Sequence, residues 1–205
     1  MTNDRGALAA APEWLSEIAE PSDDTVSELA DEDAAPADTL GHALVIVVDD
    51  RGPVDDRGRA ANGKTVGALV TELLEEAQFV VDGVVVVPSD EVAVRNALNT
   101  AVIGGVDLAV TIGGVGVGAR DVTPEATAEI LDKRLPGIDE ALRSSGLAAG
   151  ATDAGLSRGL AGVSGSTVVI NLASSRAAIR DGMATLTPLA VHVIEHVAGA
   201  DDQAD

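Results

Sequence analysis

The segment from Thr111 to Thr127 brings together the residue types that an anion-binding loop needs. It reads TIGGVGVGARDVTPEAT, and its four glycines can bring the backbone close to a ligand because they carry no Cβ atom. Arg120 can pair with a phosphate through its guanidinium, whereas Asp121 would repel that phosphate unless a divalent cation lay between them. The segment therefore indicates a place to hold an anion. The glycines of its turn are Gly113, Gly114, Gly116 and Gly118.

The residues on either side of this loop predict a strand before it and a helix after it. Residues 107–112 form a short apolar run, Thr123 is a suitable N-cap, and Pro124 suits the first helical position. Many glycine-rich turns are only tight connections between a strand and a helix. The Arg-Asp-x-Thr-Pro-Glu continuation is what favours a binding site over such a connection.

From His42 onward the chain alternates short apolar runs with amphipathic segments. Runs rich in β-branched residues are typical of strands that are buried on both faces of a parallel sheet. The predicted strands are Ala43–Val48, Val84–Val87, Leu108–Ile112 and Thr167–Leu172. The predicted helices cover about Val66–Leu74, Asp90–Val102, Pro124–Arg134 and Ser175–Val197. This βαβαβα order predicts a three-layer α/β/α sandwich with a mostly parallel central sheet.

Ligands of open parallel sheets bind outside the carboxyl ends of the strands. Several polar segments far apart in the sequence should meet at that edge. They are Asp49 with Asp50, Ser89 with Asp90, the 113–121 loop, and Asn171 to Ser175. Each has a structural alternative, because aspartates are common in turns and Ser or Asp commonly caps a helix. Their shared location favours function more than any single residue does.

A second motif, at residues 58–65, fits the P-loop pattern G-x-x-x-x-G-K-[ST] with the sequence GRAANGKT. Its backbone and Lys64 could hold nucleotide phosphates. A P-loop follows its strand almost directly, however, and here nine residues intervene, among them Pro53 and four aspartates. The sequence therefore favours the 113–121 loop as the phosphate site.

Charge dominates the composition. The chain has 34 acidic and 13 basic residues, a net charge of −21, and Lys64 and Lys133 as its only lysines. Such a charge argues against a nucleic-acid partner, and the scarcity of lysine and abundance of small residues resemble proteins of salt-accumulating halophiles. The chain has no cysteine, which excludes thiolate metal sites, and its three histidines are too few to indicate a zinc centre.

We expect folding to depend on salt. A net charge of −21 on a small domain causes self-repulsion, and salt at about 1 M shortens the Debye length to ~3 Å. The melting temperature should therefore rise between about 0.1 M and about 2 M KCl. An unchanged melting temperature over that range would contradict the expectation.

Composition also divides the chain into three parts. Residues 1–40 are rich in Asp, Glu, Ala and Pro and predict an acidic, largely disordered tail, in which Trp14 and Leu15 could form a short docking helix. Residues 41–199 form the predicted domain, and residues 200–205 form an acidic C-terminal tail. Neither a secretory signal nor a run of ~20 apolar residues is present, which predicts a cytoplasmic protein without a membrane partner.

The 111–127 segment resembles the Gly-Gly-Thr-Gly-x-x-x-Arg-Asp-x-Thr-Pro-Glu-Ala signature of the MoaB/Mog molybdopterin-binding family, which acts in molybdenum cofactor biosynthesis. The resemblance extends over about residues 42–198. Leu135-Pro-Gly137 resembles the family's Pro-Gly, Leu156-Ser-Arg158 its Leu-Ser-Arg, and Val163–Leu172 its final core strand. Gly63 would supply the glycine that precedes the first helix of the family pattern.

The resemblance implies a molybdopterin adenylyltransferase that uses ATP and Mg²⁺ and assembles as a homotrimer or a higher homo-oligomer. Asp121 would hold the magnesium ion, and Asp90 is the nearest match to the family's second catalytic carboxylate. The remaining family positions would bind substrate or phosphate. They are Gly113, Gly114, Val115, Gly116, Arg120, Ser157, Arg158, Asn171 and Ser174.

Three departures from the family pattern keep a second function open. Val115 replaces a threonine whose hydroxyl could donate to phosphate, and Ser89 stands where the pattern has the carboxylate of Pro-Asp. Residues 173–176, Ala-Ser-Ser-Arg, replace the family's Pro-Gly-x-Pro turn. The alternative is a diverged, inactive paralogue that binds a pterin, a nucleotide or another subunit without catalysis.

Overall fold

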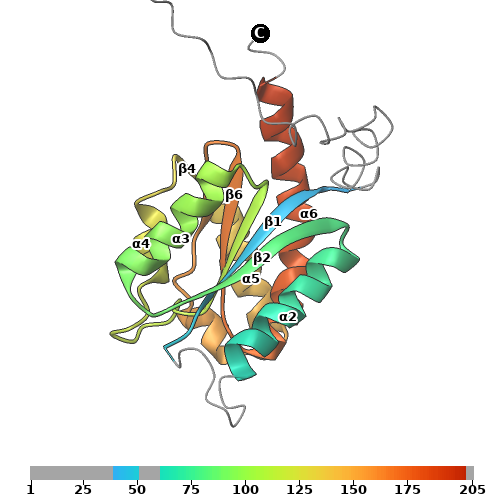
Figure 1. Ribbon diagram of the computed structural model, residues 1–205. Helices are drawn as coiled ribbons and strands as arrows, with labels where there is room; N and C mark the ends of the chain where they lie inside the picture. Colours follow the sequence, from blue (N-terminus) through green and yellow to red (C-terminus); the bar gives the residue numbers. More distant parts are fainter. Residues whose placement is uncertain (1–38, 51–60, 202–205) are drawn as a thin grey trace, which may run out of the picture. The chain divides into compact units, whose positions relative to one another are not determined.

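The computed structural model describes residues 39–50 and 61–201. Residues 1–38 and 202–205, which make up most of the two predicted acidic tails and include Trp14 and Leu15, therefore lie outside the described residues, as do residues 51–60 (Figure 1). Residues 200 and 201 of the predicted C-terminal tail are helical. None of the described helices is long and apolar enough to cross a membrane.

Six strands form one sheet at the centre of the domain. They are β1 (Gly41–Val48), β2 (Phe79–Val87), β3 (Leu108–Ile112), β4 (Lys133–Arg134), β5 (Ala161–Ser164) and β6 (Thr167–Leu172). The strand order is β2-β1-β3-β6-β5-β4. The first four of these strands pair in parallel, and β5 and β4 pair antiparallel with their neighbours.

Helices cover both faces of the sheet. They are α2 (Ala61–Glu76), α3 (Glu91–Gly104), α4 (Thr123–Ala128), α5 (Pro136–Ala148), the 3-10 turn η2 (Thr152–Leu156) and α6 (Arg176–Asp201). Helices α2, α5 and α6 pack on one face, and α3 and α4 pack on the other (Figure 1). The predicted three-layer sandwich with a mostly parallel sheet is confirmed.

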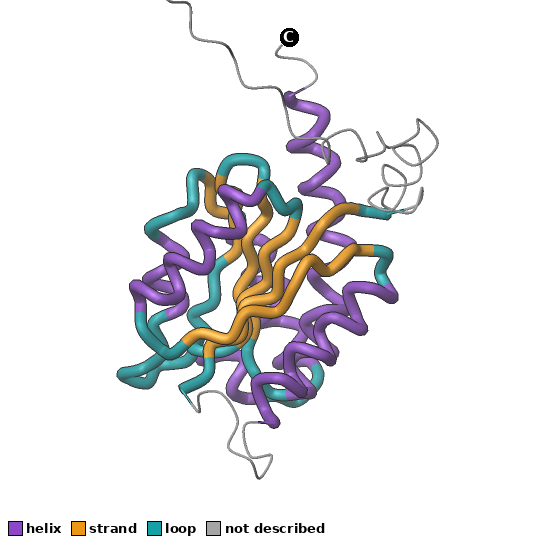
Figure 2. Tube along the Cα trace, in the orientation of Figure 1, coloured by secondary structure: helices purple, strands orange, loops and turns teal. Residues whose placement is uncertain are grey.

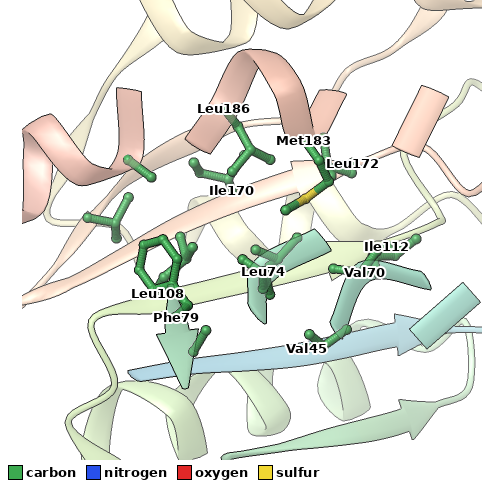
Figure 3. Packing of buried hydrophobic residues seen from close by; sticks show 14 of the residues in the cluster. Val45, Val70, Leu74, Phe79, Leu108, Ile112, Ile170, Leu172, Met183 and Leu186 are labelled. Atoms are coloured by element: carbon green, nitrogen blue, oxygen red, sulfur yellow. The ribbon is translucent and has the colours of Figure 1, made fainter. Parts of the chain in front are cut away.

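Alternation along the strands builds the two halves of the core. On β1, Val45 and Val47 face α2 and α6, whereas Ile46 and Val48 face α3. Figure 3 shows the larger half, in which side chains of α2 and α6 pack against side chains of β1, β2, β3 and β6. Because both faces of β1, β3 and β6 are covered by helices, their sequences are apolar at consecutive positions. This packing holds the carboxyl ends of the strands in fixed positions.

Two of the predicted elements have different limits in the structure. Strand β2 begins at Phe79, before the predicted start, because it pairs with β1 from Phe79 onward, with a register shift that leaves Asp82 without a partner residue on β1. Helix α4 ends at Ala128, before the predicted end, because the chain then leaves to pair residues 133–134 with β5. The sequence analysis did not predict α5, β4 or β5.

The start of α2 corrects one assignment and bears on the P-loop alternative. Helix α2 begins at Ala61, so Gly63 lies inside the helix and does not precede it. Residues 61–65, the second half of the GRAANGKT motif, are likewise helical, and residues 58–60 lie outside the described residues. The described half of the motif therefore forms helix.

Candidate functional site

The glycine loop after β3 is shaped by close contacts within the chain. Gly113 and Gly114 have φ angles of +102° and +65°, which favour glycine. A Cβ atom on Gly113 would lie 2.8 Å from the Val48 carbonyl oxygen, and one on Gly114 would lie 2.5 Å from Thr123 Oγ1. The Thr123 hydroxyl donates to the Gly113 carbonyl at 2.8 Å. Thr123 therefore braces the loop, and the prediction that it caps the helix is wrong.

Asp121 folds its side chain back onto the same loop. The Gly118 N–H donates to Asp121 Oδ2 at 2.7 Å, and the Asp121 N–H donates to the Gly118 carbonyl at 3.0 Å. A Cβ atom on Gly116 or Gly118 would lie 2.8 or 2.9 Å from Asp121 Oδ2. These two glycines thus leave room for the carboxylate, which lies against the loop that the sequence predicted for phosphate.

Three consecutive N–H groups of the loop have no hydrogen-bond acceptor among the described residues. Within the described ranges, no acceptor takes a hydrogen bond from the backbone N–H of Gly114, Val115 or Gly116. The Val115 side chain is 5% exposed and belongs to the interior. Successive N–H groups in a turn form a concavity that suits an anion. The loop therefore presents backbone donors next to one carboxylate.

Arg158 fastens this loop from a distant part of the sequence. Its Nε donates to the Gly116 carbonyl at 2.7 Å, and its Nη2 donates to the Asp121 carbonyl at 2.5 Å. Its guanidinium also pairs with Glu125, and this hydrogen bond holds the pKa of the Glu125 carboxyl below its usual range. Its backbone N–H donates to the Val115 carbonyl at 2.8 Å. Arg158, which the sequence predicted to contact substrate, thus uses its guanidinium nitrogens for hydrogen bonds within the chain.

Asp50 joins the ends of three parallel strands. Its Oδ1 accepts from the Ser89 N–H at 2.8 Å, and its Oδ2 pairs with Arg120 Nε at 2.7 Å. The hydrogen bond from Ser89, together with the charge of Arg120, lowers the pKa of the Asp50 carboxyl. Asp90 accepts from the Ala93 N–H at 2.9 Å and so caps α3, the structural alternative that the sequence allowed. A catalytic role for Asp90 stays a prediction.

Asn171 is buried at the centre of a polar network. Its Nδ2 donates to Thr111 Oγ1 at 2.8 Å and to Thr127 Oγ1 at 3.0 Å. Its Oδ1 accepts from the Leu160 N–H at 3.0 Å. The amide therefore ties β6 to β3, to α4 and to the segment before β5. These hydrogen bonds within the chain already occupy both ends of the amide. Its predicted contact with substrate stays a prediction.

A cavity of about 290 Å³ opens beside the loop, between α5, η2, the end of β6 and α6. Three predicted site residues, Ser157, Asn171 and Ser174, line it. A Cβ atom on Gly113 would lie 3.7 Å from the Ser174 Cβ, so cavity and loop adjoin. Figure 2 shows the loops after β1, β3 and β6 at the same end of the sheet. The predicted convergence at the carboxyl edge is therefore present.

Asp139 on α5 is a lining residue that the sequence analysis missed. Asp139 is 8% exposed. Burial raises the pKa of its carboxyl to about 6, while the charge of Arg143 lowers that pKa. The nearby Leu-Pro-Gly motif and the i, i+4 spacing of Asp139 and Arg143 could have indicated a helix here. Nothing in the sequence alone marked Asp139 as buried.

We expect Asp139→Asn to stabilise the domain. The folded-state pKa lies above the ordinary value of 3.8, so ionisation destabilises the fold increasingly from about pH 4 to pH 6 and fully above that range. The free energy of unfolding should therefore rise by about 2–3 kcal/mol at about pH 8, and by roughly half as much at about pH 5. Urea denaturation measures the difference. The matched variant Asp153→Asn, at an exposed carboxylate of the same cavity, should change little.

The carboxylate oxygens near the glycine loop suit magnesium better than a metal ion whose ligands all come from protein side chains. Among residues 39–50 and 61–201, no three His, Cys, Asp or Glu side chains gather in a way that could hold a metal. Mg²⁺ is commonly held by one or two carboxylates together with substrate phosphates. Asp121, beside the free N–H groups of the loop, offers one such carboxylate.

Residues 43–192 match the family described as "Probable molybdopterin binding domain". The chain belongs to this family. It is 33% identical over 133 residues to "Molybdenum cofactor biosynthesis bifunctional protein" of Chlorobaculum tepidum, covering 65% of this chain and 42% of that protein. It is 38% identical over 93 residues to "Molybdopterin adenylyltransferase" of Helicobacter pylori, covering 45% and 52%. The chain thus spans about half the length of the curated relatives it matches.

Solved structures of the family show the same fold. The chain is 60% identical to a molybdopterin biosynthesis protein from Mycobacterium abscessus, with a TM-score of 0.70. That match covers 79% of this chain and 99% of the other. The family predicted from the 111–127 segment is therefore confirmed, together with its fold.

Proposed function

We propose that the protein acts in molybdenum cofactor biosynthesis by binding molybdopterin and adenylylating it with Mg-ATP. The observation that carries this proposal is the row of free N–H groups at Gly114, Val115 and Gly116, with the Asp121 carboxylate beside it. The names of the relatives from Chlorobaculum tepidum and Helicobacter pylori support the same role.

In the proposed reaction, a terminal phosphate oxygen of molybdopterin attacks the α-phosphorus of ATP, and pyrophosphate leaves. The N–H groups of the loop would hold phosphate oxygens and neutralise part of their charge. Asp121 would hold magnesium, which when bound shields the phosphates from each other. Arg158 would keep Gly116 and Asp121 in place through its hydrogen bonds to their carbonyls. The chain thus contributes mainly positioning and charge neutralisation.

A second candidate function is binding without transfer. Two observations favour it: Asp90 caps α3, and Ser89 uses its N–H to bind Asp50. The family's second carboxylate would therefore have no free counterpart at this position. Ala173 and Ser174 also stand where the family pattern has a rigid Pro-Gly turn. In this case the protein would bind a pterin or a nucleotide, or assist assembly with another subunit.

The experiment that separates the two functions is a magnesium-dependent assay of AMP transfer from ATP to molybdopterin in about 1 M KCl. We expect transfer that is lost when magnesium is chelated. Binding of both ligands without transfer would support the second function. We further propose a cytoplasmic homotrimer, as the family resemblance implies, and light scattering at the same salt concentration tests the trimer.

A further inference from the structure

Two of the chain's three histidines lie together on the exposed side of α6. His192 and His196 are both exposed, and their ring centroids are 4.3 Å apart, with an angle of 63° between the ring planes. A spacing of four residues places their side chains next to each other on the helix surface. On the opposite side of the helix, Ala190 and Ile194 pack against the core. Two imidazoles are therefore open to solvent at one point of the surface.

A hydrogen bond of His196 leaves its second ring nitrogen available to a metal ion. His196 Nδ1 lies 2.8 Å from the His192 backbone carbonyl oxygen. A carbonyl oxygen only accepts, so Nδ1 carries the proton, and Nε2 of the neutral ring keeps its lone pair. Histidines that bind metals commonly donate their other ring N–H in this way, which fixes the orientation of the ring. Within the described part of the chain the His192 ring makes no hydrogen bond, so it can turn a nitrogen toward the same ion.

The ligands at this point of α6 select one class of metal ion. Imidazole nitrogens suit Cu²⁺, Ni²⁺ and Zn²⁺, whereas Mg²⁺ prefers oxygen ligands. Glu195 is exposed three residues after His192, on the same side of the helix, and its negative charge favours a cation. Because no three His, Cys, Asp or Glu side chains of residues 39–50 and 61–201 gather around one metal position, the two imidazoles would be joined by water ligands. Tetragonal sites with nitrogen and oxygen ligands are typical of Cu²⁺ and Ni²⁺.

We propose that His192 and His196 form a binding site for a divalent transition metal, with Cu²⁺ held most tightly. Once one imidazole binds the ion, the second binds it intramolecularly, so the pair holds the metal more tightly than a single histidine does. The ion links consecutive turns of α6. The unfolded chain does not hold the two rings at this spacing, so bound metal stabilises the folded helix.

This metal site is separate from the glycine loop. Helix α6 (Arg176–Asp201) begins just after the end of β6, and a rise of about 1.5 Å per residue puts His192 about 24 Å further along the helix. Figure 1 shows that the last turns of α6 extend past the opposite end of the sheet. The site on α6 therefore differs from the magnesium site of the proposed reaction in place as well as in ligands.

The test is calorimetric titration of the full chain with Cu²⁺ and with Ni²⁺, at about pH 8 and with excess Mg²⁺ present. Neutral imidazoles bind the metal, and Mg²⁺ occupies carboxylate oxygens that would otherwise take up the added ions. We expect one Cu²⁺ per chain, bound more tightly than Ni²⁺. His192→Gln and His196→Gln should each weaken Cu²⁺ binding at least about tenfold, because each leaves a single imidazole. Glutamine is a good helix former, so both variants should fold as the wild type does.

The matched control is His42→Gln, since His42 is the remaining histidine and its Nδ1 pairs with Asp82. This variant should bind Cu²⁺ as the wild type does. Electron paramagnetic resonance of the bound Cu²⁺ should show two imidazole nitrogens in the wild type and in His42→Gln, and one in each α6 variant. Equal Cu²⁺ affinity in the wild type and both α6 variants, or an equal loss in His42→Gln, would overturn the inference.

Discussion

Asp121→Asn should abolish magnesium-dependent binding of ATP while leaving the glycine loop folded. An asparagine side chain keeps an oxygen that can accept from the Gly118 N–H, which now lies 2.7 Å from Asp121 Oδ2. It loses the negative charge that a cation needs between two anions. We expect the affinity for Mg-ATP to fall at least about 100-fold with little change in melting temperature, as measured by calorimetric titration at high salt.

Two matched variants complete this experiment. Gly118→Ala should displace the Asp121 carboxylate, because a Cβ atom on residue 118 would lie 2.9 Å from Asp121 Oδ2. The affinity for Mg-ATP should therefore fall although the carboxylate is still present. Lys64→Ala should change little, because nine residues separate the P-loop-like motif from the end of β1, too many for the motif to hold phosphates as a P-loop does. If Lys64→Ala abolished binding and Asp121→Asn kept it, the phosphate site would be at residues 58–65 and the proposed mechanism would be wrong.

Arg158→Ala should disorder the glycine loop and weaken its binding of Mg-ATP. The guanidinium donates to two loop carbonyls and pairs with Glu125, and hydrogen bonds to charged groups contribute about 1.5–3 kcal/mol each when well sheltered. Because the side chain is 39% exposed, we expect the free energy of unfolding to fall by only about 2 kcal/mol. Mg-ATP affinity should fall about 100-fold, since the loop loses the hydrogen bonds that hold Gly116 and Asp121 in place.

Arg95→Ala is the control for this variant. Arg95 on α3 pairs with Glu91 of the same helix and with Glu129 just after α4, at a similar exposure of 30%, and these ion pairs do not involve the glycine loop. Its loss should reduce stability slightly and leave ligand binding unchanged. Arg158→Lys should recover charge but not the forked hydrogen bonds, and so should bind ligand poorly. Normal binding by Arg158→Ala would show that the loop holds its shape without this side chain.

The N–H groups of the glycine loop show how much of the site the sequence predicted. Four glycines and the Arg-Asp-x-Thr-Pro-Glu continuation predicted an anion site, and the structure adds which donors are free. It also explains the glycines differently, because contacts with Val48, Thr123 and Asp121 within the chain already require them. Glycine content alone is therefore weaker evidence for a ligand than the free N–H groups.

The sequence by itself determined the family, the order of the main strands and helices, and the edge of the sheet where polar residues gather. These properties follow from local patterns: runs of β-branched residues, helical spacing of apolar residues, and a contiguous loop motif. They need no knowledge of which distant segments meet. The buried strands β1, β3 and β6 were predicted well for this reason.

Only the tertiary structure decided what Arg158, Asn171 and Asp139 do. Arg158 reaches carbonyls 42 and 37 residues earlier in the chain, and Asn171 bonds to Thr111 and Thr127, 60 and 44 residues away. The burial of Asp139 depends on packing between α5 and its neighbours, and a single helical turn of sequence does not specify that packing. Such roles arise from contacts between segments far apart in sequence, which local patterns do not encode.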